Sequence, residues 1–131
     1  AYKRYLKKHG EEKPIEGFEQ YNNEQIFFMG YAMSWCGLMT PDKLIFHILT
    51  NTHSPNRFRV NQVLANRPEF AADFKCAADP CVDFFEFSCG NWIAEHPIPD
   101  HKTSYSQFEV LTDKVQEQMR GNTDKHNHSK F

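Results

Sequence analysis

The sequence predicts a mainly α fold, a compact disulfide-tied bundle of about five or six helices. Thr40-Pro41 and Asp79-Pro80 each place a capping residue before a first-turn proline, which is typical of helix starts. Apolar residues recur at helical spacing along several segments. Four cysteines in 131 residues favour two disulfides that tie these helices together.

Glycine, proline and capping residues place the individual helices. Six helical segments are expected in this order: residues 1–9, 26–39, 41–50, 68–76, 81–93 and about 106–120. Gly10 stops the first helix, and Asn22 or Asn23 caps the second. The second helix is apolar nearly all round and should be the central buried one. Ser106 and Glu109 fit a capping box at the start of the last.

Between the helices, residues 51–60 are expected to form a loop, because they combine proline with asparagine. Residues 60–64 form either a short strand or a helical turn. Two prolines within residues 96–99 break the fifth helix. Residues 122–131 lack periodicity and are predicted to be a disordered tail. The rest, residues 1–121, is expected to form a single domain with one core.

Composition limits the classes of partner. The net charge of −2 gives no electrostatic reason to expect nucleic acid. No apolar run approaches the roughly 18 residues of a membrane span, and no secretory signal pattern is present. The chain begins at Ala1 without Met, so we expect it to be excised or processed from a longer one. Twelve phenylalanines must pack in a core or meet a protein or peptide ligand, and self-association is a further expectation.

The four cysteines have two interpretations, a zinc site with four thiolates or two disulfides. Zinc sites use two closely spaced cysteine pairs, and only Cys76 and Cys81 come near that spacing. Disulfides are therefore favoured, and they indicate an oxidising, extracellular compartment. If residues 81–93 form one continuous helix, Cys81 and Cys89 lie about 12 Å apart along its axis and cannot bond each other.

Two connectivities remain. Pairing Cys76 with Cys81 and Cys36 with Cys89 fits the spacing better, because the short link between Cys76 and Cys81 needs only a turn. The other connectivity, Cys36 with Cys81 and Cys76 with Cys89, stays open on this reasoning.

Two longer motifs carry a family resemblance. The run THSPNRFRV (52–60) resembles the C-terminal end of neprilysin-type zinc metallopeptidases, and DPCVDFFEFSCGNW (79–92) resembles their N-terminal beginning. The resemblance extends over residues 1–76 and 79–120, in an order opposite to the family's. It implies the same disulfides, Cys36–Cys89 and Cys76–Cys81. It also implies that the two family ends lie together, so that the reversed order can fold.

The catalytic middle of the family is missing from this sequence. Such peptidases should carry H-E-x-x-H on a helix, with two zinc-ligating histidines and a general base, and a third ligand in E-x-x-x-D. Neither motif is present, and no two of the seven histidines are four residues apart. We therefore expect no cofactor, no metal site and no catalysis by this chain alone.

Two family positions that contact substrate do persist. His53 matches the histidine that stabilises the oxyanion, and Arg59 matches the arginine that hydrogen-bonds a substrate carbonyl. Both roles are implied by the resemblance alone, and plain structural roles for the two side chains are the favoured interpretation here. A further family arginine, linked to substrate carboxylates, falls at Ser104, which weakens the case for retained substrate specificity.

The leading functional hypothesis is a secreted, non-catalytic pseudoenzyme module that acts by binding or as a structural piece. The second hypothesis is an enzyme: part of a neprilysin-like zinc endopeptidase whose missing motifs lie in another segment or chain. A third is a rearranged or engineered sequence with no function of its own.

Overall fold

A computed structural model describes residues 2–75 and 82–128, and it confirms the mainly α class. The described part contains seven helices and two short strands: α1 (Tyr2–His9), α2 (Asn23–Met33), β1 (Gly37–Met39), α3 (Pro41–Thr50), α4 (Asn56–Ala65), α5 (Pro68–Asp73), α6 (Phe84–Glu95), β2 (Ser104–Ser106) and α7 (Gln107–His128). The predicted Cys76–Cys81 disulfide and the Asp79-Pro80 helix start lie outside the described residues.

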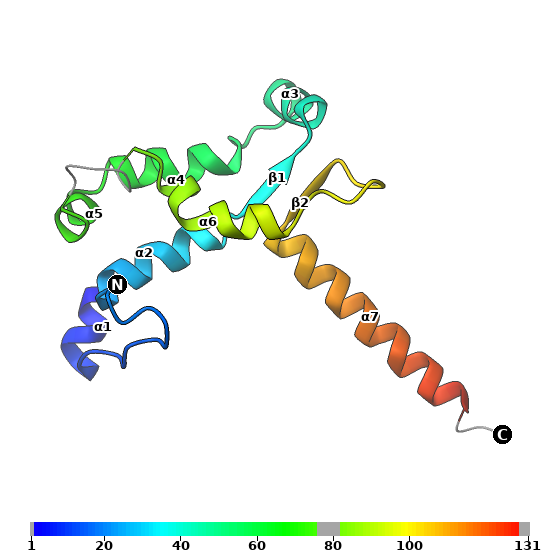
Figure 1. Cartoon of the computed structure of the whole chain (residues 1–131), viewed down its shortest axis with the longest axis horizontal. Coiled ribbons are helices and arrows are strands. Elements are labelled where there is room, and N and C mark those ends of the chain that lie inside the picture. Colours follow the sequence, from blue (N-terminus) through cyan, green and yellow to red (C-terminus); the bar gives the residue numbers. More distant parts are fainter. Residues whose placement is uncertain (1, 76–81, 129–131) are drawn as a thin grey trace.

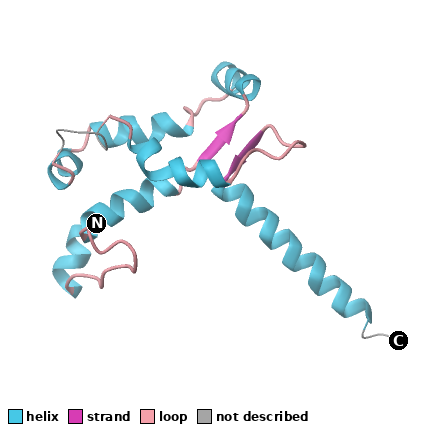
Figure 2. Ribbon diagram, in the orientation of Figure 1, coloured by secondary structure: helices cyan, strands magenta, loops and turns pink. Residues whose placement is uncertain are grey.

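Helices α2, α4, α5 and α6 gather around the core, α3 stands at the far end of β1, and α7 extends away from the others (Figures 1 and 2). Nine residues form the buried cluster: Met29, Ala32, Cys36, Val60, Leu64, Phe70, Phe84, Phe85 and Cys89. Phe70 meets Phe84 edge-on, with ring centroids 4.8 Å apart. Core packing thus accounts for the three buried phenylalanines, Phe70, Phe84 and Phe85. Phe27 and Phe87, by contrast, are exposed.

Helices α1, α2 and α3 end or begin at the residues that the sequence predicts. Gly10 follows α1 with a φ of 83°, the left-handed conformation typical of a glycine that ends a helix. The Asn22 side chain accepts from the Gln25 N–H at 2.8 Å, and the Gln25 side chain accepts from the Asn22 N–H at 2.9 Å. This reciprocal pair is a capping box that begins α2. Thr40 caps α3 through the Lys43 N–H.

The predicted helix over residues 26–39 ends early. α2 stops at Met33, and β1 pairs antiparallel with β2 in the register Gly37↔Ser106, Leu38↔Tyr105, Met39↔Ser104. An extended conformation wins because a partner strand far along the chain supplies its hydrogen bonds, and such tertiary pairing overrides local propensity.

The predicted loop over residues 51–60 is also too long. α4 begins at Asn56, Pro55 is its N-cap residue, and residues 60–64 are helical. Proline and asparagine were interpreted as turn residues, but they also suit a helix start. The carbonyl oxygen of Pro55 accepts from the N–H groups of Phe58 and Arg59, which closes the first turn.

The last two helices differ from prediction at their ends. α6 begins at Phe84 with Asp83 as its cap, not at residue 81. Helix α7 continues to His128, so Gly121 does not end it. One glycine inside a helix costs about 1 kcal/mol, which the good helix formers that precede it, QEQMR at residues 116–120, can offset. Within the described residues, no helix is both long enough and apolar enough to cross a membrane.

Asp83 fastens α6 to α4. Its carboxylate accepts hydrogen bonds from the Asn61 amide at 2.8 Å and the Glu86 N–H at 3.1 Å, and it pairs with Arg57. Partial burial alone would raise the pKa of the Asp83 carboxyl, but these hydrogen bonds and the Arg57 charge together lower it below its usual value. The ionised carboxylate therefore stabilises this contact between the two helices.

Asp83→Asn keeps a capping side chain but removes the charge. Because the folded pKa is lowered, the charge contributes stability above the unfolded pKa near 4, and this contribution is lost as the pH falls through the lower folded pKa. We expect the melting temperature of the variant to lie below that of the parent at pH 7. The gap should close toward pH 3. Thermal melts from pH 3 to pH 7 measure it, and a gap that does not change with pH would contradict the role of the charge.

Gly37→Ala tests the close approach of β1 to β2. A Cβ at Gly37 would lie 2.9 Å from the Ser106 Cβ and 3.1 Å from the Tyr105 carbonyl oxygen. We expect the free energy of unfolding to fall by about 1–3 kcal/mol, as for overpacked sites. Gly30→Ala is the matched control, since a Cβ there meets nothing within 4 Å in mid-helix, and it should stabilise by up to about 1 kcal/mol. Equal effects in urea unfolding would contradict the prediction.

Candidate functional site

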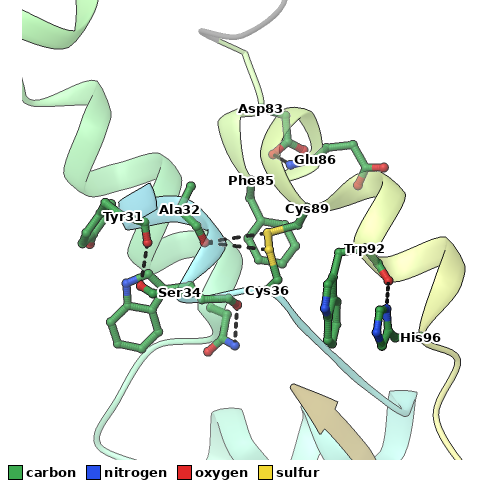
Figure 3. The surroundings of a disulfide bond; sticks show 12 residues. Tyr31, Ala32, Ser34, Cys36, Asp83, Phe85, Glu86, Cys89, Trp92 and His96 are labelled. Carbon is green, nitrogen blue, oxygen red and sulfur yellow. Dashed lines mark hydrogen bonds between the residues drawn. A yellow bond between two sulfur atoms is a disulfide. The ribbon is translucent and has the colours of Figure 1, made fainter. Parts of the chain in front are cut away.

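The Cys36–Cys89 disulfide joins the segment after α2 to the middle of α6 (Figure 3). The two Cα atoms are 5.3 Å apart, and both residues are buried. Both sulfurs lie against the Ala32 carbonyl oxygen, at 4.0 and 3.7 Å. The bridge agrees with the sequence prediction. Helix geometry excludes a Cys81–Cys89 bond only if residues 81–93 form one helix. In the structure, α6 begins only at Phe84.

The residues beside Cys36 connect three further parts of the fold. The Trp35 carbonyl oxygen accepts from the Asn56 amide at 2.8 Å, at the start of α4. The Cys36 carbonyl oxygen accepts from the Gln107 N–H at 3.1 Å, at the start of α7. Since Gly37 pairs with β2, residues 35–37 hold α4, α6, β2 and α7 in place together.

His53 lies in the loop between α3 and α4. Its N–H donates to the Asn51 side-chain oxygen at 2.8 Å, and its carbonyl oxygen lies 2.8 Å from Nε2 of His47. These two contacts hold the backbone of the loop, while the His53 side chain is exposed. The imidazole is thus accessible to a ligand.

Arg59 lies in the first turn of α4, partly buried. Its Nε donates to the Ser54 carbonyl oxygen at 2.9 Å, and its guanidinium carbon lies 4.9 Å from the centre of a Trp35 ring. The Tyr31 hydroxyl donates to the Arg59 carbonyl oxygen at 3.0 Å. The side chain is therefore held by Trp35 and by the loop that carries His53, while Tyr31 of α2 holds the Arg59 backbone.

The structure ties the two predicted residues to one loop without bonding them to each other. Arg59 bonds the carbonyl of Ser54, the neighbour of His53, and no hydrogen bond joins the two side chains within the described part of the chain. An exposed imidazole and a guanidinium with unused donors can each bind the carbonyl oxygen of a peptide. Within the described residues, no hydrogen bond pairs either side chain with a nucleophile or a general base.

The described side chains bring together no zinc site. Across residues 2–75 and 82–120, no three His, Cys, Asp or Glu side chains come together as metal ligands. Ser104, at the position of a family arginine, lies in β2 with its hydroxyl 3.4 Å from a Glu109 carboxylate oxygen. No step of metal chemistry can be derived from this donor set.

The residues that support Arg59 and its loop were not predicted from the sequence. These residues are Trp35, Tyr31 and His47. A tryptophan next to a cysteine in a buried segment was the available signal. It indicates a rigid, aromatic neighbourhood that an arginine can stack on.

Comparison of the sequence with known proteins matches both parts of the chain to one peptidase family. A sequence model of peptidase family M13 matches residues 1–82, and a second model of the same family matches residues 80–130. Neprilysin-1 of Caenorhabditis elegans is 54% identical over 79 residues, which is 60% of this chain and 10% of the relative. Human neprilysin is 42% identical over 76 residues, 58% of this chain and again 10% of the relative. No solved structure matches significantly.

The described fold is helical and tied by a disulfide, and both family models that match the sequence are models of a peptidase. The chain belongs to peptidase family M13, so the resemblance to neprilysin-type enzymes is confirmed. It spans about a tenth of the length of the curated relatives it matches, at 10% of Neprilysin-1 and 10% of human neprilysin.

Arg59→Ala should loosen the loop that carries His53. The variant loses the bond to the Ser54 carbonyl and the contact with Trp35. We expect a loss of about 1–2 kcal/mol in the free energy of unfolding and faster hydrogen exchange at the His53 amide. Arg67→Ala is the control, because no hydrogen bond of its side chain is found in the described structure. Unchanged exchange in the Arg59 variant would contradict the role assigned to this side chain.

Proposed function

We propose that this chain is a secreted, non-catalytic module of peptidase family M13 that acts by binding another protein or as a structural piece. The residues it contains suit recognition, because His53 and Arg59 can meet a peptide backbone and no hydrogen bond among the described residues pairs either side chain with a nucleophile or a general base. Retained peptide affinity through Arg59 would be weak. An exposed hydrogen bond of this kind contributes roughly tenfold in affinity at most.

The apolar surface of α3 carries this proposal. Leu44, Ile45, Ile48 and Leu49 are four of its large apolar residues, and Leu49 is 78% exposed. No residue of α3 is buried. Contiguous exposed apolar side chains on one helix favour an interaction site. Its occupant is a protein partner with a complementary apolar face, or a second copy of this chain where that partner is missing.

The buried disulfide supports an extracellular location. A Cys36–Cys89 bridge persists where the surroundings are oxidising and is rare in the cytosol. Both cysteines contribute to the core, so the fold should depend on this bridge. This chemistry supports a location outside the cell or in a secretory compartment.

The second candidate is a piece of an active M13 zinc endopeptidase. One observation favours it: the chain matches two models of the family, yet its match covers only about a tenth of a relative's length. In that case the apolar surface of α3 would be covered by the remaining peptidase polypeptide, which would supply the zinc ligands.

Sedimentation velocity over a range of concentrations tests the binding role. The parent chain is expected to self-associate as the concentration rises, and Leu49→Asp should remain monomeric. Gln62→Asp is the matched control, since it adds the same charge to an exposed position of α4 and should behave like the parent. Identical, purely monomeric behaviour of all three chains would refute a binding role for the α3 surface.

Zinc content and peptide hydrolysis of the same samples separate the two candidates. We expect no stoichiometric zinc after desalting and no chelator-sensitive cleavage of peptides. One equivalent of zinc together with such cleavage would replace the first candidate by the second.

A further inference from the structure

A cavity of about 530 Å³ opens between α1, α2, α4 and α5, away from the α3 surface. Its walls include Tyr2, Phe27, Phe28, Tyr31 and Leu64. This volume lies in the range of small-molecule sites, which are concave and mostly apolar with a few charged groups. In Figure 1, α3 and α5 lie at opposite ends of α4, so the cavity is separate from the proposed docking surface.

The aromatic wall is ordered and offers an apolar face. The Tyr2 ring stacks on Phe27 with centroids 4.8 Å apart, and Phe27 meets Phe28 edge-on at 5.7 Å. The Tyr2 hydroxyl donates to a Glu12 carboxylate oxygen at 2.6 Å, and the Tyr31 hydroxyl donates to the Arg59 carbonyl. Since both hydroxyls are already bonded elsewhere, the rings present carbon to a ligand.

Four charged side chains line the same cavity: Lys3, Glu24, Arg67 and Glu69. The ion pairs of the described residues lie elsewhere, at Arg57–Asp83 and Lys102–Asp113. None of the four charges is therefore neutralised by a protein partner within that part of the chain. They remain available to a ligand.

The positions of these charges favour an anionic ligand. Glu24 and Glu69 lie in the first turns of α2 and α5, where the helix dipole already stabilises a carboxylate. Lys3 lies in the first turn of α1, which contains no acidic residue and where the dipole disfavours a cation. Arg67 directly precedes α5 and belongs to neither ion pair of the described residues. The two cations therefore lack compensation, whereas the carboxylates have it.

We propose that this cavity binds a small amphipathic carboxylate, whose apolar body lies against the rings of Tyr2, Phe27 and Phe28 and whose charge meets Lys3 and Arg67. Desolvated aromatic contacts supply affinity, and the cations supply selectivity for the carboxylate.

The test is a titration of the ¹⁵N-labelled chain with 1-naphthaleneacetate, followed through the amide shifts of Phe27, Phe28 and Val63. The cation 1-(aminomethyl)naphthalene, which has the same ring system, is the comparison ligand. We expect saturable shifts with the carboxylate and a dissociation constant about fivefold or more below that of the cation, the range of an exposed charge contact.

Arg67→Gln and Lys3→Gln should each raise the dissociation constant of the carboxylate about fivefold. Arg4→Gln removes the same charge one residue from Lys3 without lining the cavity and should leave the constant unchanged. Val63→Trp should abolish binding by filling the cavity, with far-UV circular dichroism showing that the helices persist. Leu49→Asp should bind like the parent, which keeps this result independent of the α3 surface.

Two results would overturn the proposal. Equal affinity for the two naphthalene ligands would leave only an unselective apolar patch. Shifts that do not saturate, or that are the same in Val63→Trp, would leave no site in this cavity.

Discussion

The short segment of residues 35–37 is the constraint on which the rest of the fold depends. Cys36 bonds Cys89 and thereby fixes the middle of α6 against the end of α2. The carbonyl oxygens of this segment accept from the starts of α4 and α7, and Gly37 pairs with β2. Because the bridge joins residues 53 apart in sequence, it also removes much of the freedom of the unfolded chain. The disulfide therefore helps a core of nine buried residues to remain folded.

Signals that act within one turn of helix were predictable from sequence. The capping box that begins α2 and the Thr40 cap of α3 each join residues three positions apart, so neighbours alone decide them. The end of α2 was not predictable in this way. Gly37 lies in a strand because it pairs with Ser106, which is far along the chain. Its neighbour Cys36 is bonded to α6, which precedes β2 in the chain. Long-range pairing of this kind has no local signature.

The candidate site shows the same division. His53 and Arg59 were found because they stand in a run that resembles a peptidase motif, which identifies positions but not their surroundings. What orders Arg59 comes from distant residues: Trp35 lies beneath its guanidinium and Tyr31 bonds its carbonyl. Trp35 is the neighbour of Cys36, and Tyr31 lies in α2, which directly precedes that segment. The disulfide therefore supports the loop that contains His53 indirectly, through the stack of Trp35 on Arg59.

The placement of the buried residues separates stability from binding. All nine belong to α2, α4, α5 and α6 or to Cys36, while α1 and α3 contribute none. The proposed α3 surface contains no core residue, and the cavity between α1, α2, α4 and α5 shares only Leu64 with the buried cluster. Substitutions at the other surface and lining positions remove little buried area, so they can change affinity at small cost in stability. The core around Cys36 tolerates far less change, because close-packed side chains and the disulfide share the same few contacts.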